Sequence, residues 1–599
     1  MKNSGAPRRL LAIFIMLGSS CLAATALAQS SAPASRSRPD SSVIARIREE
    51  GLSRSQVMQT LDYLCNVIGQ RLTGSPNCRQ ANEWTRKQLE SWGLEDAHLE
   101  PWGPFGRGWA VKRFSVQVVE PYTIPLNGCP RAWTPGFDKP FEADVVYLDA
   151  KKDEDLEKYK GKLKGTIVLV GPVRDLQARW DPLSLRVTDS DLLKLADAEP
   201  GATSPPGQAR AATPAERQAM LADTPAGRAL LNRATTRPFG RGGPGGSLFA
   251  GRLLNFAFQQ GAALVIGPST QGDGGTIFVA SAVIPGQGAR GGGGFGPNAP
   301  HVYSVDPPPI PAQVTLAVED YNRLVRMIQL GQKLRMAVDL RVQFYDEDRM
   351  AYNTIAEIPG SDLKDQIVMV GGHLDSWQSG TGATDNGAGV AAGMEAVRII
   401  EALGLHPRRT IRIGLWTGEE EGLLGSRAYV TKHFGYYPDG GGARRGGGRR
   451  GQIAGGDASS GPTTRPARAL VRADEYERLS VYFNLDNGSG KIRGIYMQGN
   501  EGARPLFRSW LAPFADLGAD TLTPSNTGST DHVPFDAIGL PAFQFIQDPI
   551  EYWSRTHHSN EDVYDRIQAE DMKQASTIMA AFIYNAAMMD DRFPRKPLR

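Results

Sequence analysis

Three apolar, strand-like runs of this sequence are each followed at once by side chains that can bind a metal ion. The runs are 365–370, 410–416 and 479–485, and the side chains after them are His373, Asp375, Glu419, Glu420 and Asp486. In open α/β sheets, ligands bind outside the carboxyl ends of the strands. The sequence therefore predicts that carboxylates and an imidazole meet at one edge of a sheet.

Two further segments carry side chains of the same kinds. Asp385 lies in a glycine-rich loop that opens a helical pattern near residue 390, and His557 and His558 lie in a polar turn far down the chain. Each feature alone has an ordinary explanation, since an Asp close to Gly is typical of a turn. Their coincidence favours a functional site. No cysteine has zinc-finger spacing, so any metal ion must be held by His and carboxylates.

As a set and in order, these residues resemble the co-catalytic zinc exopeptidases of metallopeptidase family twenty-eight (peptidase M28, aminopeptidase or carboxypeptidase Q-like). The resemblance is carried by GGHLDSWQSGTGATDNGAG (371–389), LWTGEEEGLLGSRAY (415–429), NLDNG (484–488), HHSNED (557–562) and IGQRLTGS (68–75). It covers about residues 45–120 and 340–595. The segment between them is similar to a protease-associated domain inserted in such enzymes.

The resemblance implies a site for two zinc ions per chain. Asp385 would be the carboxylate that both ions share. His373 and Asp486 would complete one ion, and Glu420 and His558 would complete the other. Two zinc ions about 3.5 to 4 Å apart can bridge a water, lower its pKa and polarise the scissile carbonyl. The family pattern also implies a cis peptide bond after Asp385.

The same comparison assigns roles to residues beside the ligands. Glu419 would be the general base, because it precedes a ligand and its side chain leaves the backbone in a different direction. Asp375, two residues after His373 in an extended chain, would hold the imidazole. Many family members have Tyr where this chain has His557, so His557 or Tyr552 would stabilise the oxyanion instead. His532 resembles a residue of a segment that lines the cleft, and a structural role is equally open.

The implied activity is that of an exported, zinc-dependent exopeptidase that hydrolyses terminal peptide bonds of small peptides, as an aminopeptidase or dipeptidase. A carboxypeptidase of the same family stays open, because the residues that recognise a free amine or carboxylate lie outside the shared phrases. A glutaminyl cyclase would need one zinc ion, and an inactive receptor-like protein would be expected to have lost ligands. The implied partner is a peptide substrate, and a homodimer is possible.

Alternating strand-like and helical patterns predict an α/β fold with a mixed, largely parallel sheet sandwiched by helices, 390–403 and 502–517 among them. The resemblance implies the zinc exopeptidase fold with an inserted, mostly β protease-associated domain. We expect the catalytic domain to comprise 42–114 and 341–599 and the inserted domain to comprise 115–340. Strands are predicted at 143–147, 165–170 and 262–266. A segment of about 175–246, rich in Ala, Arg, Pro, Thr and Gly, is expected to be mostly mobile.

Composition excludes a fully disordered chain, because 41% of the 599 residues are hydrophobic and 22% are charged. The formal net charge is +3, and three of the basic residues (Lys2, Arg8, Arg9) lie in a predicted leader. Without them the charges balance, so we expect no general affinity for nucleic acid or acidic membranes. The low-complexity patches 286–300 and 439–461 are predicted surface loops, the Arg-rich second one included.

The N-terminus has the pattern of a signal peptide over 1–28, with an apolar stretch too short to span a bilayer and an Ala-Leu-Ala cleavage signal. A membrane anchor is the alternative. A flexible stalk is predicted at 29–41, and an exported protein, periplasmic or extracellular, without stable membrane insertion. In that compartment Cys65 and Cys78 are near enough to pair, and three buried thiols are equally compatible with the sequence.

Overall fold

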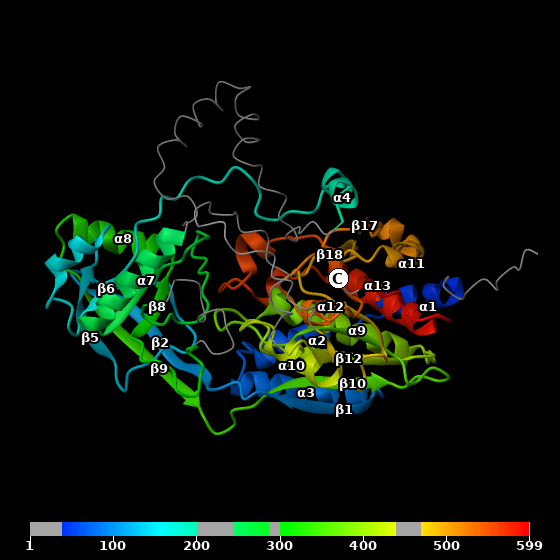
Figure 1. The fold of residues 1–599 in the computed structure, drawn as a ribbon. Helices are drawn as coiled ribbons and strands as arrows, with labels where there is room; N and C mark the ends of the chain where they lie inside the picture. Colours follow the sequence, from blue (N-terminus) through cyan, green and yellow to red (C-terminus); the bar gives the residue numbers. More distant parts are fainter. Residues whose placement is uncertain (1–38, 201–243, 287–299, 439–468, 598–599) are drawn as a thin grey trace, which may run out of the picture. The chain divides into compact units, whose positions relative to one another are not determined.

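Two eight-stranded mixed sheets form the framework of the protein (Figure 1). The computed structural model describes residues 39–200, 244–286, 300–438 and 469–597. The strand order is β1-β10-β12-β11-β15-β18-β16-β17 in the first sheet and β3-β2-β9-β5-β6-β7-β8-β4 in the second. A short pair, β13 (Gly435–Tyr436) and β14 (Val471–Arg472), forms a separate ribbon.

The first sheet is parallel at its centre. Its strands are β1 (Glu95–Trp102), β10 (Ala351–Ile358), β11 (Ile367–His373), β12 (Thr410–Trp416), β15 (Leu479–Asn484), β16 (Ile492–Tyr496), β17 (Thr521–Thr523) and β18 (Ala542–Gln547). β12, β11, β15 and β18 are parallel neighbours, whereas β1, β10 and β16 join antiparallel. β11, β12 and β15 are buried along their whole length, as expected of strands covered on both faces. They match the three predicted runs.

Helices cover both faces of the first sheet. One face packs against α1 (Ser41–Ser53), α2 (Val57–Asp62), α9 (Ala388–Ala402), α11 (Arg504–Leu511) and α13 (Ala569–Met588). The other face packs against α10 (Leu424–His433) and α12 (His532–Ala537) through a cluster of aromatic side chains. α3 (Pro76–Ser91) follows the π-helix η1 (Tyr63–Ile68) and contacts β1 and β10. The predicted α/β fold with a largely parallel sheet between helices is confirmed.

One predicted helix is shorter than its pattern suggested. α9 matches the prediction for 390–403, but the segment 502–517 contains α11 flanked by the short 3-10 turns η5 (Glu501–Ala503) and η6 (Ala512–Leu517). Pro513 has no backbone N–H to donate into the preceding turn, so a regular helix cannot continue through it.

The second sheet forms its own hydrophobic core. Its strands are β2 (Gly108–Glu120), β3 (Ile124–Pro125), β4 (Gly128–Pro130), β5 (Phe141–Tyr147), β6 (Ile167–Leu169), β7 (Leu264–Pro268), β8 (Ala312–Leu316) and β9 (Arg335–Tyr345). The associated helices are η2 (Asp153–Tyr159), α7 (Pro244–Gln259) and α8 (Val318–Gln329). The predicted strands 143–147, 165–170 and 262–266 correspond to β5, β6 and β7, which are parallel neighbours. We call residues 108–345, from the start of β2 to the end of β9, the second domain. Its identification as a protease-associated domain stays a prediction.

The chain enters and leaves the second domain through two long, antiparallel strands. β2 pairs with β9 along nearly its whole length, and Phe114 lies opposite Leu340 in that register. The predicted domain boundaries therefore fall within this pair of strands.

Part of the segment that we expected to be mobile has defined contacts with the first domain. Leu185 forms a β-bridge with Ile550, and Leu192 of α4 (Asp189–Ala196) packs with Tyr496 and Ile546. The composition of the segment did not indicate these contacts, because a few apolar and charged residues among Pro and Ala are enough to hold an extended segment against the first domain. The rest of the predicted insertion, 201–243, lies outside the described residues.

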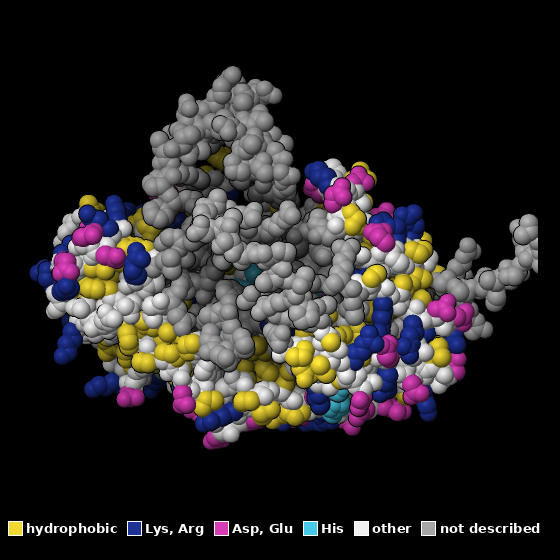
Figure 2. All heavy atoms as spheres, viewed as in Figure 1, with side chains coloured by type: hydrophobic (Ala, Val, Ile, Leu, Met, Phe, Trp, Pro, Cys, Tyr) yellow, Lys and Arg dark blue, Asp and Glu magenta, His cyan; other side chains and the backbone are white. Residues whose placement is uncertain are grey.

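The three cysteines within the described residues are free thiols, and of these Cys65 and Cys78 are buried without forming a disulfide. Of the two readings left open by the sequence, the structure therefore has the unpaired one. The predicted signal peptide, nearly all of the predicted stalk and the 439–461 patch lie outside the described residues; Ser41 already begins α1, capped by Asp40. Among the described residues, no helix has the length and apolar character that crossing a membrane requires. On the face in Figure 2, the basic and acidic side chains drawn in colour are interspersed.

Candidate metal centre

The site lies at the carboxyl ends of the central parallel strands. β11 ends at His373, β12 leads within three residues to Glu419, and β15 leads to Asp486. The turn after β12 requires glycine at 418, because its φ is +74° and an added Cβ would lie 2.6 Å from the ring of Trp102. Parallel strands thus deliver these side chains to one edge, as the sequence predicted.

A first group of ligand-type side chains consists of His373, Asp385 and Asp486, which lie close together and are all buried. Nε2 of His373 is 3.3 Å from Oδ1 of Asp385 and 3.4 Å from Oδ1 of Asp486. Asp385 comes from η3 (Ala383–Gly387), directly before α9. Its peptide bond to Asn386 is cis, as the resemblance implied. We call this set the strand-end group.

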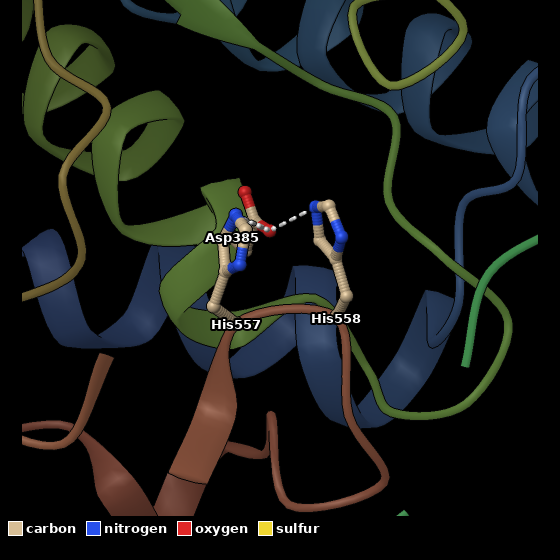
Figure 3. Close-up of side chains that lie close together, drawn as sticks. All are labelled: Asp385, His557 and His558. Atoms are coloured by element: carbon tan, nitrogen blue, oxygen red, sulfur yellow. Dashed lines mark ion pairs between the residues drawn. The ribbon is translucent and has the colours of Figure 1, made fainter. Parts of the chain in front are cut away.

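A second group shares Asp385 and adds the two adjacent histidines (Figure 3). Both imidazoles are turned toward the Asp385 carboxylate, with Nε2 at 3.3 Å for His558 and 3.8 Å for His557. Nε2 of His558 is also 2.9 Å from Oε2 of Glu420. The structure thus brings together Asp385, Glu420 and His558, as predicted for the second ion. We call Asp385, Glu420 and His558 the loop group, and His557 lies beside it.

His557, predicted as a hydrogen-bond donor to the oxyanion, packs directly against His558 of the loop group. Its ring stacks on that of His558 with centroids 3.7 Å apart. Burial lowers the pKa of His557 to about 3, so the imidazole is neutral near neutral pH. Both histidines therefore have ligand geometry toward Asp385, and the choice of His558 as ligand stays a prediction from the family register.

The atoms that face one another in these groups fit a bound metal ion. Nε2 of His373, Oδ2 of Asp385, Oε1 of Glu420 and Oδ1 of Asp486 are buried and have no hydrogen-bond partner. Buried polar atoms are nearly always hydrogen bonded, so unpartnered ligand atoms that converge need another explanation. Imidazole and carboxylate donors at such spacing suit zinc. The residues present fit the cofactor that the sequence predicted; the number of ions is a prediction.

Asp375 links the end of β11 to the turn after β12. Its carboxylate accepts hydrogen bonds from the backbone N–H groups of Glu419 (3.4 Å) and Glu420 (3.3 Å). Nδ1 of His373 lies 3.1 Å from the carbonyl oxygen of Asp375 and 3.5 Å from its carboxylate. Asp375 therefore orients both the predicted base and a predicted ligand, more than the sequence led us to expect.

Glu419, the predicted general base, lies beside the strand-end group. Its Oε2 is 4.0 Å from Nε2 of His373. Burial raises the pKa of Glu419 well above its ordinary value, while the charge of His373 opposes this shift. A carboxyl group with a raised pKa in such a place is suited to accept and release a proton.

The two remaining candidates, Tyr552 and His532, differ in their position relative to the ligand groups. Tyr552 is buried, with its ring centroid 4.8 Å from that of His557. His532 belongs to neither ligand group, and its Nε2 lies 3.1 Å from the carbonyl oxygen of Thr527. His532 therefore lies outside both groups, at the start of α12. Its neighbour Asp531 is also fully buried, and burial raises the pKa of that carboxyl to about 7.

The sequence analysis missed three residues that shape the centre. Asp562 accepts hydrogen bonds from the backbone N–H groups of Thr384 (2.6 Å) and Asp385 (3.2 Å), which fixes the turn of the shared carboxylate. Thr73 donates to Asp375 at 3.0 Å. The buried Arg71 guanidinium donates to the carbonyl oxygens of residues 374, 381 and 382. Their signal was present, since all three lie within phrases that carried the resemblance.

The fold and site together define an α/β domain with a candidate metal site at the carboxyl edge of its sheet. Residues 353–439 and 463–583 match the model of Peptidase family M28. The match includes every predicted ligand. The second domain lies outside it.

Curated relatives and a solved structure are also similar to this chain. Carboxypeptidase Q of Mus musculus is 28% identical over 305 residues, 50% of this chain and 56% of the relative. Carboxypeptidase Q of Xenopus laevis is 44% identical over 132 residues, 22% of this chain and 28% of the relative. The chain thus spans about half or less of the length of these relatives. A crystal structure of a peptidase M28 precursor from Shewanella amazonensis SB2B has the same fold, with a TM-score of 0.56 at 21% identity, covering 93% of this chain and 99% of that one.

Proposed function

We propose that this protein is an exported, zinc-dependent exopeptidase that hydrolyses terminal peptide bonds of small peptides. The observation that carries the proposal is the convergence of the strand-end and loop groups on Asp385, with unpartnered, buried ligand atoms facing one another. A receptor-like protein that has lost catalysis would have no reason to keep these atoms unpaired, because each costs about 1–3 kcal/mol when left unsatisfied.

In this proposal His373, Asp385 and Asp486 hold one zinc ion, and Asp385, Glu420 and His558 hold the other. Zinc bound there would lower the pKa of a water molecule and polarise the scissile carbonyl. Glu419 accepts the proton of the attacking water and donates it to the leaving amine. Asp375 keeps Glu419 and His373 in register through the contacts described above.

Developing negative charge on the carbonyl oxygen needs a hydrogen-bond donor on the opposite side from Glu419. His557 is suited to this role because it is neutral and borders the loop group. Tyr552, packed against His557, is the alternative donor.

Three substrates separate the possible terminal specificities. An aminoacyl amide reports an aminopeptidase, an N-blocked peptide with a free carboxylate reports a carboxypeptidase, and an unblocked dipeptide reports a dipeptidase. We expect the aminopeptidase or dipeptidase activity. Carboxypeptidase activity is the second candidate, because the curated relatives bear that name.

The mechanism is tested by Glu419→Gln, which keeps the shape of the side chain and removes its basicity. We expect kcat to fall by about 100-fold or more, the scale of a general base, with zinc content unchanged. Glu570→Gln, at an exposed carboxylate of α13, is the matched control and should have full activity. Unchanged hydrolysis by Glu419→Gln would refute the assigned mechanism.

A further inference from the structure

The loop that carries the two histidines is held from two sides by the second domain. This ligand loop, residues 550–562, lies between segments 183–187 and 275–279. Leu185 pairs with Ile550 and Phe278 pairs with Ser559 as β-bridges. A domain that lies outside the match to the peptidase family thus contacts the part of the site that supplies the loop group.

The contacts of the first segment are made with the start of the ligand loop. The N–H of Leu185 donates to the carbonyl of Ile550 at 2.9 Å, and the N–H of Ile550 donates back at 2.8 Å. The hydroxyl of Ser554 donates to the carbonyl of Leu183 at 2.7 Å. These bonds fix the backbone entering the turn that leads to His557.

The second segment binds the loop at and just after the ligand. The N–H of Val279 donates to the carbonyl of His558 at 3.0 Å. Asn560 and Ile277 exchange two hydrogen bonds, from the Asn560 N–H to the Ile277 carbonyl (3.2 Å) and from the Ile277 N–H to Oδ1 of Asn560 (2.7 Å). The backbone of the ligand is therefore fixed directly by a residue of the second domain.

Both contact points coincide with strained backbone. Ile550 has a φ of +46° and His558 a φ of +60°, in the left-handed region that residues with a Cβ rarely adopt. Such conformations persist only where surrounding contacts hold them, and they cluster at functional sites. Here the contacts that hold them are the peptide hydrogen bonds with Leu185 and Val279.

Arg186 anchors the first segment to the first domain. Its guanidinium lies 2.8 Å from both Asp548 and Asp571, whose side chains are 1% and 3% exposed. The next residue, Val187, donates its N–H to Asp548 at 2.9 Å. Buried carboxylates need such partners, so this contact places residues 183–187 against the loop in one register.

We propose that the second domain is a structural part of the metal centre, and that Arg186 and Asn560 are positioning residues that hold the ligand loop in its metal-binding conformation. This inference rests on the proposed function for the identity of the metal. It predicts that loosening either contact weakens the metal ion of the loop group and leaves the ion of the strand-end group unchanged.

The test uses the full chain with Arg186→Ala and Asn560→Ala, and Lys194→Ala as a control on the exposed side of α4. In metal-free protein, we expect the amides of residues 550–562 to exchange hydrogen at least about tenfold faster in both variants than in the control. Titration with zinc against a chromogenic chelator should show the second equivalent bound at least about tenfold more weakly and the first unchanged. Arg186→Lys should restore part of both effects.

Arg186→Ala leaves two buried carboxylates short of a partner, so Ser554→Ala decides the question if that variant does not fold. The proposal would be overturned if hydrogen exchange in the loop and zinc binding were unchanged both in Asn560→Ala and in Arg186→Ala, or in Ser554→Ala where Arg186→Ala does not fold. Equal weakening of both zinc equivalents would also overturn it. A wild-type protein that hydrolyses no peptide, with loop exchange and zinc affinity altered as expected in the variants, would contradict the proposed function and support this inference.

Discussion

The strand-end group and the loop group share one carboxylate but are built differently. His373 and Asp486 sit at the ends of buried parallel strands, and their side chains are 1% and 8% exposed. His557 and His558 sit on a loop, and their side chains are 27% and 32% exposed. The hydrogen-bonded sheet fixes the first group, whereas the second group depends on contacts with another domain. The first sheet itself therefore positions one group, whereas the position of the other depends on how a loop is held by contacts outside that sheet.

Replacing Asp385, the residue that both groups share, should weaken zinc binding at both and cause the largest loss of activity. In Asp385→Asn, neither group keeps its common charged ligand, so we expect zinc content to fall at both and hydrolysis to drop at least about 1,000-fold, the scale of several kcal/mol of lost charge stabilisation. Metal analysis and kcat/KM measure this. Asp516→Asn, at an exposed carboxylate, should have normal zinc content and activity. Loss of only one ion would mean that Asp385 is not shared.

Removing one histidine from each group should separate them by stability. In metal-free protein, His373→Ala removes the imidazole that faces the buried carboxylates of Asp385 and Asp486. The free energy of unfolding should therefore fall by about 1–3 kcal/mol. His558→Ala removes a partly exposed ring and should lower it by less than about 1 kcal/mol. Denaturant unfolding of both variants measures this. Equal losses would show that the loop group is as integral to the fold as the strand ends.

Asp375 gives a finer test of the strand-end group. Asp375→Asn keeps the size of the side chain but removes the charge that faces Nδ1 of His373. Zinc affinity at the strand-end group should fall about 10-fold to 100-fold, the range for partners of a ligand. The loss at the loop group should be smaller, because Asp375 contacts only the backbone N–H of Glu420 there. Competitive zinc titration distinguishes the two equivalents. A variant that weakens both equally would place Asp375 in a general structural role.

The same division explains what could be predicted from the sequence. The strand-end residues follow apolar runs of β-branched and aromatic residues, and the edge at which such strands end is dictated by their parallel pairing. The contacts of the ligand loop were not predictable, because Leu185 and Arg186 lie in a stretch whose composition indicated mobility. Likewise, Asp562 and Thr73 act through backbone N–H and carboxylate contacts that depend on tertiary approach. Local pattern therefore predicted which side chains meet at this edge of the sheet but not what holds them in place, and their roles as ligands come from the family resemblance.

The smallest expected effect concerns the helix that follows Glu420, whose far end is fixed by charge. His433, the last residue of α10, lies with Nε2 2.8 Å from Glu100 and Nδ1 3.2 Å from Glu475. Lys432 and Arg412 also face these carboxylates, at 2.8 and 2.9 Å, and His98 lies 3.9 Å from Glu100. Burial opposes charging of His433, but Glu100 and Glu475 raise its pKa overall. Burial likewise opposes ionisation of Glu475, but His433 and Arg412 lower its pKa to about 2.

The sign of the pH dependence follows from these two shifts. A histidine with a raised pKa contributes stability below its ordinary value of 6.5, and that contribution is lost as the pH rises through its folded pKa. A glutamate with a lowered pKa contributes above its ordinary value of 4.5, and loses this as the pH falls toward 2. The cluster is therefore most stabilising between about pH 4.5 and 6.5.

His433→Asn should lower the free energy of unfolding by about 1 kcal/mol at about pH 5.5 and by much less at about pH 8.5, as for a partly buried ion pair. Denaturant unfolding at both pH values measures the difference, with His406→Asn, at an exposed histidine, as the control. Because α10 begins at Leu424, four residues after the predicted ligand Glu420, zinc affinity should stay unchanged in this variant if the turn after β12 alone positions Glu420. A parallel loss of zinc affinity would show that the position of Glu420 depends on the distant contacts of His433.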